Sequence, residues 1–137
     1  MKTKFMLLFA AFMLTLGMSA KKYPQIKFET TVIDFGTFSM DDAVRKCTFK
    51  FTNVGDAKLV INSVNPSCGC TVADDYPKDF IAPGGSGEIH ITYNGKGKSL
   101  GPFRKVIRVE TNSKETEVRL VIQGKMTDVP VSKKTKD

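Results

Sequence analysis

Apolar and polar residues alternate along several short segments of the chain beyond about residue 25. The clearest segment is 45–52, where Cys47, Phe49 and Phe51 fall on one face and lysines and threonines occupy the other. Successive side chains of a strand point to opposite faces, so this pattern predicts a half-buried β-strand. Residues with the same pattern recur at short intervals, separated by residues that favour turns.

About seven strands are predicted in this way. They cover residues 25–30 continuing through 32–38, then 45–52, 58–64, 71–73, 88–94, 103–111 and 116–124. The expected core residues are the inward apolar positions: Leu59, Ile61, Val64, Ile89, Ile91, Tyr93, Phe103, Ile107, Val109, Val118, Leu120 and Ile122. Residues 40–42 and 53–56 are expected to be turns, the second because Asn53 and Gly55 accept positive φ at low cost.

The sequence contains no amphipathic helix that could connect parallel strands. Regular short strands with turn signals therefore predict an all-β fold, an immunoglobulin-like β-sandwich. The chain contains no tryptophan, so the Cys…Trp…Cys signature of antibody domains is absent.

The first 20 residues read as a signal peptide. Lys2 and Lys4 precede twelve uncharged residues, and small residues follow before Lys21. That apolar run is shorter than the roughly 20 residues that span a bilayer. The expected organisation is a signal peptide over 1–20, a sandwich domain over 21–126 and a polar, basic, disordered tail over 127–137.

Export changes how the composition is interpreted. The 137-residue chain has a formal charge of +7, which falls to +5 once the leader is removed. We expect a periplasmic or secreted protein without a lipid anchor, since no cysteine precedes Cys47, and without a transmembrane span after cleavage. The basic excess is compatible with acidic surface polymers or anionic lipid. Nucleic acid is not an expected partner, because basic and aromatic residues are not interleaved in one patch.

Several segments together resemble the bacterial domain of unknown function 1573. They are Phe35-Gly36, residues 49–56, 59–61 with Val64, Ser67-Cys68-Gly69-Cys70-Thr71, residues 81–84 and 101–103. The resemblance implies an exported module similar to the Ig-like domains of the abnormal-spindle and Hydin type, with no catalytic residues. Cys47 departs from it, in a position where an ordinary core residue is expected.

Cys68 and Cys70 are the candidate disulfide or redox residues. In an oxidising compartment they can bond to each other, with Gly69 permitting the bend, or serve as a plain turn. A strained, exposed bond would be redox-active, and two thiolates could bind Cu(I) or Zn(II). Bonds from Cys47 to either cysteine, or a three-cysteine cluster, stay open at this point.

The other candidates are weaker. His90, the only histidine, is expected on the exposed face of its strand, so a hydrolase would lack a nucleophile–base pair. The loop 95–99 lacks the spacing of a phosphate loop, and Asp74, Asp75 and Asp79 lack that of a calcium loop.

The sequence thus predicts a non-enzymatic binding or structural module of the cell envelope, with no cofactor and no metal. Its expected partner is another protein or an envelope component. The alternative is a thiol-redox or soft-metal protein acting through Cys68 and Cys70.

Overall fold

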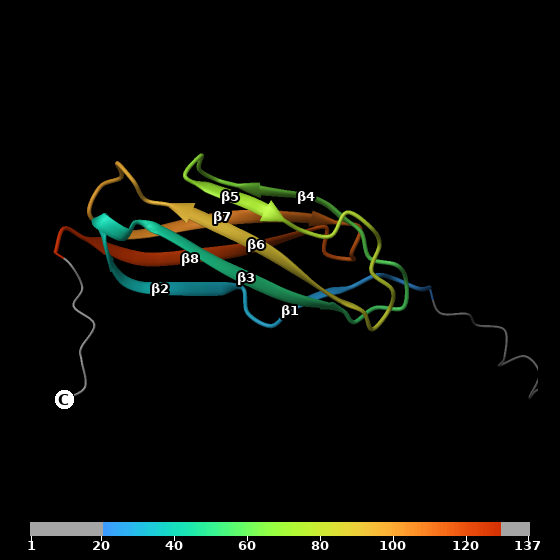
Figure 1. Ribbon diagram of the computed structural model, residues 1–137. Coiled ribbons are helices and arrows are strands. Elements are labelled where there is room, and N and C mark those ends of the chain that lie inside the picture. The colour runs from blue at the N-terminus through green and yellow to red at the C-terminus, as the bar shows by residue number, and fades with distance from the viewer. Residues whose placement is uncertain (1–20, 130–137) are drawn as a thin grey trace, which may run out of the picture.

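In the computed structural model, which describes residues 21–129, eight strands form two four-stranded sheets packed face to face (Figure 1). The first sheet has the order β1 (Ile26–Phe28), β3 (Val44–Asn53), β6 (Ser86–Asn94) and β5 (Thr71–Asp75). The second has the order β2 (Val32–Ser39), β8 (Glu117–Thr127), β7 (Gly101–Thr111) and β4 (Ile61–Pro66). The predicted all-β, Ig-like sandwich is confirmed.

The expected core lies between the sheets. Ten of its twelve predicted members are buried, while Phe103 and Val118 are partly buried and pack against the others. Phe28, Phe38 and Met126 join this core from β1, β2 and β8. Alternation in the sequence located the core because each strand has one face against the other sheet and one toward solvent.

The first predicted strand is in fact two strands in different sheets. The Glu29 N–H still donates to Lys50 in the first sheet, whereas the Thr31 carbonyl accepts from Val121 in the second. The chain therefore changes sheets around Thr30, and β2 runs parallel to β8. An alternating pattern does not report which sheet a strand joins, so the sequence could not reveal the change.

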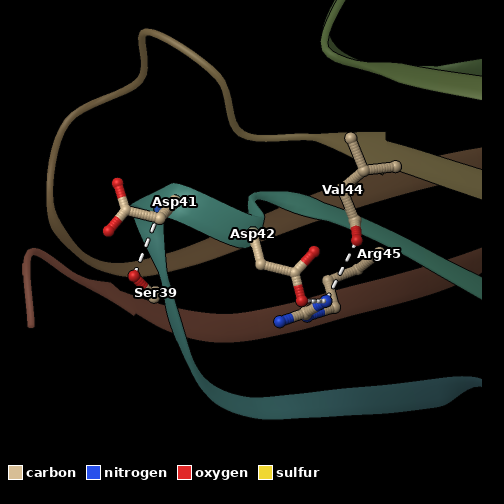
Figure 2. Close-up of polar contacts among 5 residues, drawn as sticks. All are labelled: Ser39, Asp41, Asp42, Val44 and Arg45. Carbon is tan, nitrogen blue, oxygen red and sulfur yellow. Dashed lines mark hydrogen bonds and ion pairs between the residues drawn. The ribbon is translucent and has the colours of Figure 1, made fainter. Parts of the chain in front are cut away.

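The predicted turn at 40–42 is a short 3-10 helix, η1 (Met40–Asp42), between β2 and β3. The Ser39 hydroxyl accepts a hydrogen bond from the Asp41 N–H at 3.1 Å, which caps the turn. Arg45 then donates to Asp42 at 3.2 Å and to the Val44 carbonyl at 3.1 Å (Figure 2). These bonds fix the end of the sandwich at which the loop between β6 and β7 also lies (Figure 1).

The expected turn at 53–56 has a different physical basis. Asn53 ends β3 and is fully buried, and its side chain makes four hydrogen bonds. Its Oδ1 accepts from the N–H groups of Gln25 (3.2 Å) and Gly55 (3.0 Å), and its Nδ2 donates to the carbonyls of Ala57 (2.8 Å) and Ile81 (3.0 Å).

Close approach, rather than positive φ, explains the glycine in this turn. Among the described residues, positive φ occurs only at Gly36, Gly84, Gly97 and Gly101. A Cβ at Gly55 would lie 2.5 Å from the Gln25 nitrogen. The turn thus packs directly against the backbone that leads into β1.

The expected domain boundaries fall partly inside and partly outside the described residues. The expected signal peptide, residues 1–20, and residues 130–137 of the expected tail lie outside the described residues. Thr127, placed in the tail by the sequence, instead ends β8 and pairs with Ser39. Within residues 21–129 no helix has the length and apolar character needed to cross a membrane.

Candidate functional site

The loop between β4 and β5 contains the two cysteines singled out by the sequence. Cys68 and Cys70 form a disulfide, with their Cα atoms 5.2 Å apart. The Cys70 N–H lies 3.1 Å from the Cys68 sulfur, and the Thr71 N–H donates to the Cys68 carbonyl at 3.1 Å. Gly69 has no positive φ, and a Cβ there would meet open space. Gly69 permits the bend, as expected, but the bend does not require glycine, because an ordinary residue fits.

This loop carries the chain from one sheet to the other. The Ser67 N–H donates to the Val106 carbonyl at 2.9 Å, and the Ser67 hydroxyl accepts from the Val106 N–H at 3.3 Å. On the far side, the Cys70 carbonyl accepts from the Asn94 N–H at 2.8 Å. The crossing is thus anchored to β7 in one sheet and to β6 in the other.

The two sulfurs lie in different environments. Cys70 is 6% exposed and belongs to the core, whereas Cys68 is half-buried. An attacking thiolate would reach Cys68, and the Cys68–Cys70 bond would break with Cys70 as the leaving thiolate. A thiolate in apolar surroundings is disfavoured, so Cys70 is a poor leaving group. The burial pattern is that of a structural link more than of an exchange centre.

Cys47 takes no part in this loop. It lies in β3 opposite Ile91, with Ala73 of β5 on the other side of Ile91, whereas Cys70 lies beside Asn94. Cys47 is a free, partly buried thiol against the core, and burial raises its pKa to about 11. Within residues 21–129 no three His, Cys, Asp or Glu side chains are placed to hold a metal ion.

His90 occupies the solvent face of β6, as predicted, but it has a polar neighbour on each side. Its Nδ1 lies 3.0 Å from the Thr48 hydroxyl and its Nε2 lies 3.4 Å from a Glu88 carboxylate oxygen. A hydroxyl thus lies beside the histidine, which the sequence did not indicate. However, β6 is hydrogen-bonded to β3 and β5 on both sides, so its own backbone N–H groups are used in the ladder. Stabilising an oxyanion requires backbone N–H groups that are free to donate. We therefore interpret the row of Thr48, His90 and Glu88 as a polar contact between neighbouring strands.

The remaining motifs fall on the surface. Asp74 accepts a hydrogen bond from Thr92, and Asp75 lies opposite His90. In the loop 95–99, the Lys98 N–H donates to the Gly95 carbonyl at 3.0 Å, with Gly97 at φ +72°. The loop connects two strands, and the N–H groups of a helix N-terminus that a phosphate loop needs are not part of it.

The structure reveals an open strand edge that the sequence analysis did not. β4 ends at Pro66, opposite Ile107, while β7 begins six residues earlier at Gly101. Residues 101–105, called here the open β7 edge, pair with β8 on one side only. The edge is uncovered because the chain leaves β7 at Ser67 and crosses to β5.

A depression of about 280 Å³ lies along the open β7 edge. Its floor contains Tyr93 and Phe103, whose rings stack with centroids 4.3 Å apart. Burial raises the pKa of Tyr93 and so keeps this phenol neutral. Lys98, Arg104 and Lys105 line the depression, giving it a basic rim around an aromatic floor.

A second, larger depression of about 540 Å³ lies beside the same half of β7. Asp34, Arg104, Gln123 and Lys125 supply its charged and amide side chains. Hydrogen bonds from the Gly36 N–H (2.7 Å) and the Gln123 amide (3.2 Å) lower the pKa of Asp34. Its carboxylate therefore holds the bulge in β2, while Arg104 and Lys125 form no ion pair within the described part of the chain.

Lys105 is the residue of this region that sequence reasoning missed. Phe103 and Ile107 were placed on the core face of their strand, and strict alternation puts Lys105 between them on that face. Lys105 pairs with the fully buried Ile122 yet is only partly buried itself. A lysine in an inward position was the available signal, since such a charge marks a strand edge that is not covered.

Solved structures of other proteins show the same fold. A protein of unknown function from Porphyromonas gingivalis W83 superposes with a TM-score of 0.67 at 20% identity, over 80% of this chain and 50% of that one. The ASH/PapD-like domain 7 of human CEP192 gives 0.57 at 13% identity, over 82% and 92%. The YadV chaperone gives 0.54 at 15% identity, over 82% and 55%. The chain spans about half the length of the first of these, and at such identities the likeness shows the fold alone.

No curated protein matches the chain significantly. The family model described as "Protein of unknown function (DUF1573)" matches residues 26–126, which is the sandwich from β1 to near the end of β8. The chain therefore belongs to the DUF1573 family.

Proposed function

We propose that this protein is an exported, non-enzymatic binding module of the cell envelope that holds a protein or envelope partner at one end of its sandwich. The observation that carries this proposal is the anchored crossing at residues 67–71, which leaves a strand edge of β7 uncovered beside it. Ig-like sandwiches bind through loops held by the rigid sheets or through strand edges. Here a loop and an edge of this kind lie together.

The polar surface elsewhere supports binding over catalysis. The hydroxyl–imidazole–carboxylate row of Thr48, His90 and Glu88 lies on a sheet face where β6 is hydrogen-bonded to a strand on each side. The disulfide, the other chemical candidate, would have to release a buried thiolate. Both arrangements are better suited to stability than to turnover.

Site-specific photo-crosslinking in the native cell tests this function. A photoreactive residue at Ser67 or Lys98, both exposed and beside the open β7 edge, should give a discrete adduct. The same residue at Lys27 in β1, at the opposite end of the sandwich (Figure 1), should not. Adducts at none of a set of positions spread over both sheets and both ends would refute the binding function.

Two further measurements address export and the redox alternative. Intact mass of the cell-derived protein should show the loss of about 20 N-terminal residues. The double variant C68S/C70S should keep its fold and its adduct if the cysteines are structural. Loss of the adduct with the fold intact, together with a reduction potential well above the roughly −300 mV of structural disulfides, would favour the thiol-redox alternative.

A further inference from the structure

The open β7 edge presents unused backbone hydrogen-bonding groups. In an antiparallel ladder, residues alternate between those whose N–H and C=O face one neighbour and those that face the other. Val106 faces the β4 side, because it exchanges hydrogen bonds with Ser67. Arg104 and Pro102 lie two and four residues before it, so their backbone groups face the same side, where no strand lies among residues 21–129.

This edge is free of the register shifts that three of the four edge strands contain, and the fourth edge strand, β1, is only three residues long. The edge strands β2, β4 and β5 each contain a register shift, and a bulge of this kind obstructs the addition of another strand. The pairing of β7 with β8 has no shift from Gly101 to Glu110. Beyond Gly101, whose φ is +110°, a strand added here would therefore meet backbone without a register shift.

The charge around the edge determines what can be added. Lys98, Arg104 and Lys105 form no ion pair within the described residues, and Lys105 points to the core side at the mouth of the sandwich. A neutral strand would cover these charges without neutralising them, and a basic one would be repelled. Phe103, which is partly buried and stacks on the buried Tyr93, provides an apolar surface beneath for one side chain of an incoming strand.

We propose that the open β7 edge binds an extended acidic peptide segment of a protein partner, which adds as a strand to β7 in the place that β4 leaves free. Alternate acidic side chains of the segment contact Lys98 and Lys105, and its backbone bonds to Arg104. This inference rests on the binding function above and specifies the partner's chemistry.

The test uses the full exported chain and a labelled heptapeptide with threonine at its even positions, glutamate at positions 1, 3 and 7 and valine at position 5, so that the glutamates and the valine share one face. Fluorescence anisotropy should show saturable binding that weakens at higher salt. Two control peptides isolate the two elements of recognition. One has the same sequence with alternate N-methylated amides, which removes backbone donors and keeps the charge, and the other replaces glutamate by lysine. Both should bind at least about tenfold more weakly, a difference of one 1.4 kcal/mol increment.

Variants and exchange locate the site. Lys105→Glu should weaken the acidic peptide at least about tenfold, whereas Lys27→Glu, an equal charge change on the exposed face of β1, should have little effect. Amide hydrogen exchange on the unmodified chain provides a readout that needs no variant. The peptide should slow exchange at the Arg104 N–H and leave the already paired N–H groups of β6 unchanged.

Strand addition would be overturned if the N-methylated peptide bound as tightly as the unmodified acidic peptide. It would also be overturned if inorganic polyphosphate displaced the acidic peptide and the Arg104 N–H showed no protection from exchange. Either result would leave a surface that binds anions by charge alone. The outcome is separable from that of the proposed function. If no acidic peptide binds but Ser67 still crosslinks in the cell, the docking mode is wrong and the binding module stands.

Discussion

Replacing Asn53 tests the most concentrated set of polar contacts in the sandwich. The change N53A removes four hydrogen bonds that join the end of β3 to the β1 approach, to its own turn and to the bridge at Ile81. A hydrogen bond contributes a net of about 0.5–1.5 kcal/mol, so four bonds set a range of about 2–6 kcal/mol. After the change, the Ile81 carbonyl still accepts a hydrogen bond from the Leu59 N–H, and water can reach the N–H groups of Gln25 and Gly55. Both effects favour the lower half of this energy range. We expect a loss of about 3 kcal/mol.

The assay is urea unfolding followed by far-UV circular dichroism, since the chain has no tryptophan to report on the core. At about 4–6 °C per kcal/mol for a domain of this size, the melting temperature should fall by about 15 °C. The matched control is N65A. Asn65 is exposed, and among residues 21–129 its amide reaches only the Ser63 hydroxyl, so its loss should stay within about 0.5 kcal/mol.

A second variant distinguishes the two halves of the side chain. N53D keeps the acceptor that serves Gln25 and Gly55 but turns the donor into an oxygen facing the carbonyls of Ala57 and Ile81. It should be at least as destabilising as N53A at neutral pH. A loss below about 1 kcal/mol for N53A would refute the reasoning, because the buried bonds would then contribute no more than exposed ones.

Three further predictions follow from the turn, the disulfide and the buried thiol. G55A should destabilise the fold by about 2 kcal/mol or more, since its Cβ has no room against the approaching backbone, while G69A should unfold at nearly the wild-type urea concentration. Reducing the Cys68–Cys70 bond should lower the free energy of unfolding by only about 1.5 kcal/mol, as expected for a three-residue ring, measured by urea unfolding with and without reductant. Folding raises the Cys47 pKa to about 11, so the unfolded thiol ionises first and its contribution to stability is lost as pH rises from about 9 to 11. C47V should therefore show a shallower fall of stability over that window, and an equal slope would contradict the assignment.

Alternation of apolar and polar residues identified the strands and most of the core because it reports a physical asymmetry that each strand carries locally. Phe49, Phe51, Ile89 and Ile91 are buried where their parity placed them. Parity says nothing about pairing, however. Near Thr30 the chain changes sheets because β1 pairs with β3 in one sheet and β2 pairs with β8 in the other. This pairing is determined only in the assembled sandwich.

At two positions in turns, residue type alone does not explain the conformation. Asn53 and Gly69 were interpreted through backbone conformation, yet neither has positive φ. Asn53 is retained by four side-chain bonds to groups far apart in sequence, and Gly69 lies in a turn that any small residue fits. Local propensity describes which backbone conformations a residue can adopt, whereas long-range contacts determine which of them it does adopt.

The parts of the candidate site that depend on neighbouring residues could be predicted from the sequence, and the parts that depend on long-range contacts could not. The cysteine pair was evident because two thiols two residues apart in an exported chain are a local feature. The open β7 edge was not, because it depends on where β4 ends relative to β7, and therefore on register. Lys105 was the one local trace of the edge, an inward lysine between Phe103 and Ile107.

An inward lysine at an uncovered edge has two consequences that share one cause. It opposes pairing between copies of this chain, because two such edges would bring two lysines together in the partly buried space between the sheets. For the same reason it favours a partner that brings the opposite charge. Pro102 acts similarly, since it lacks an N–H at a position whose backbone faces the open side and so limits the number of bonds a strand can form. K105A should therefore weaken binding of the acidic peptide and at the same time increase self-association, measured by sedimentation at rising concentration. Weaker binding without self-association would show that Lys105 only attracts, and the protective role would be refuted.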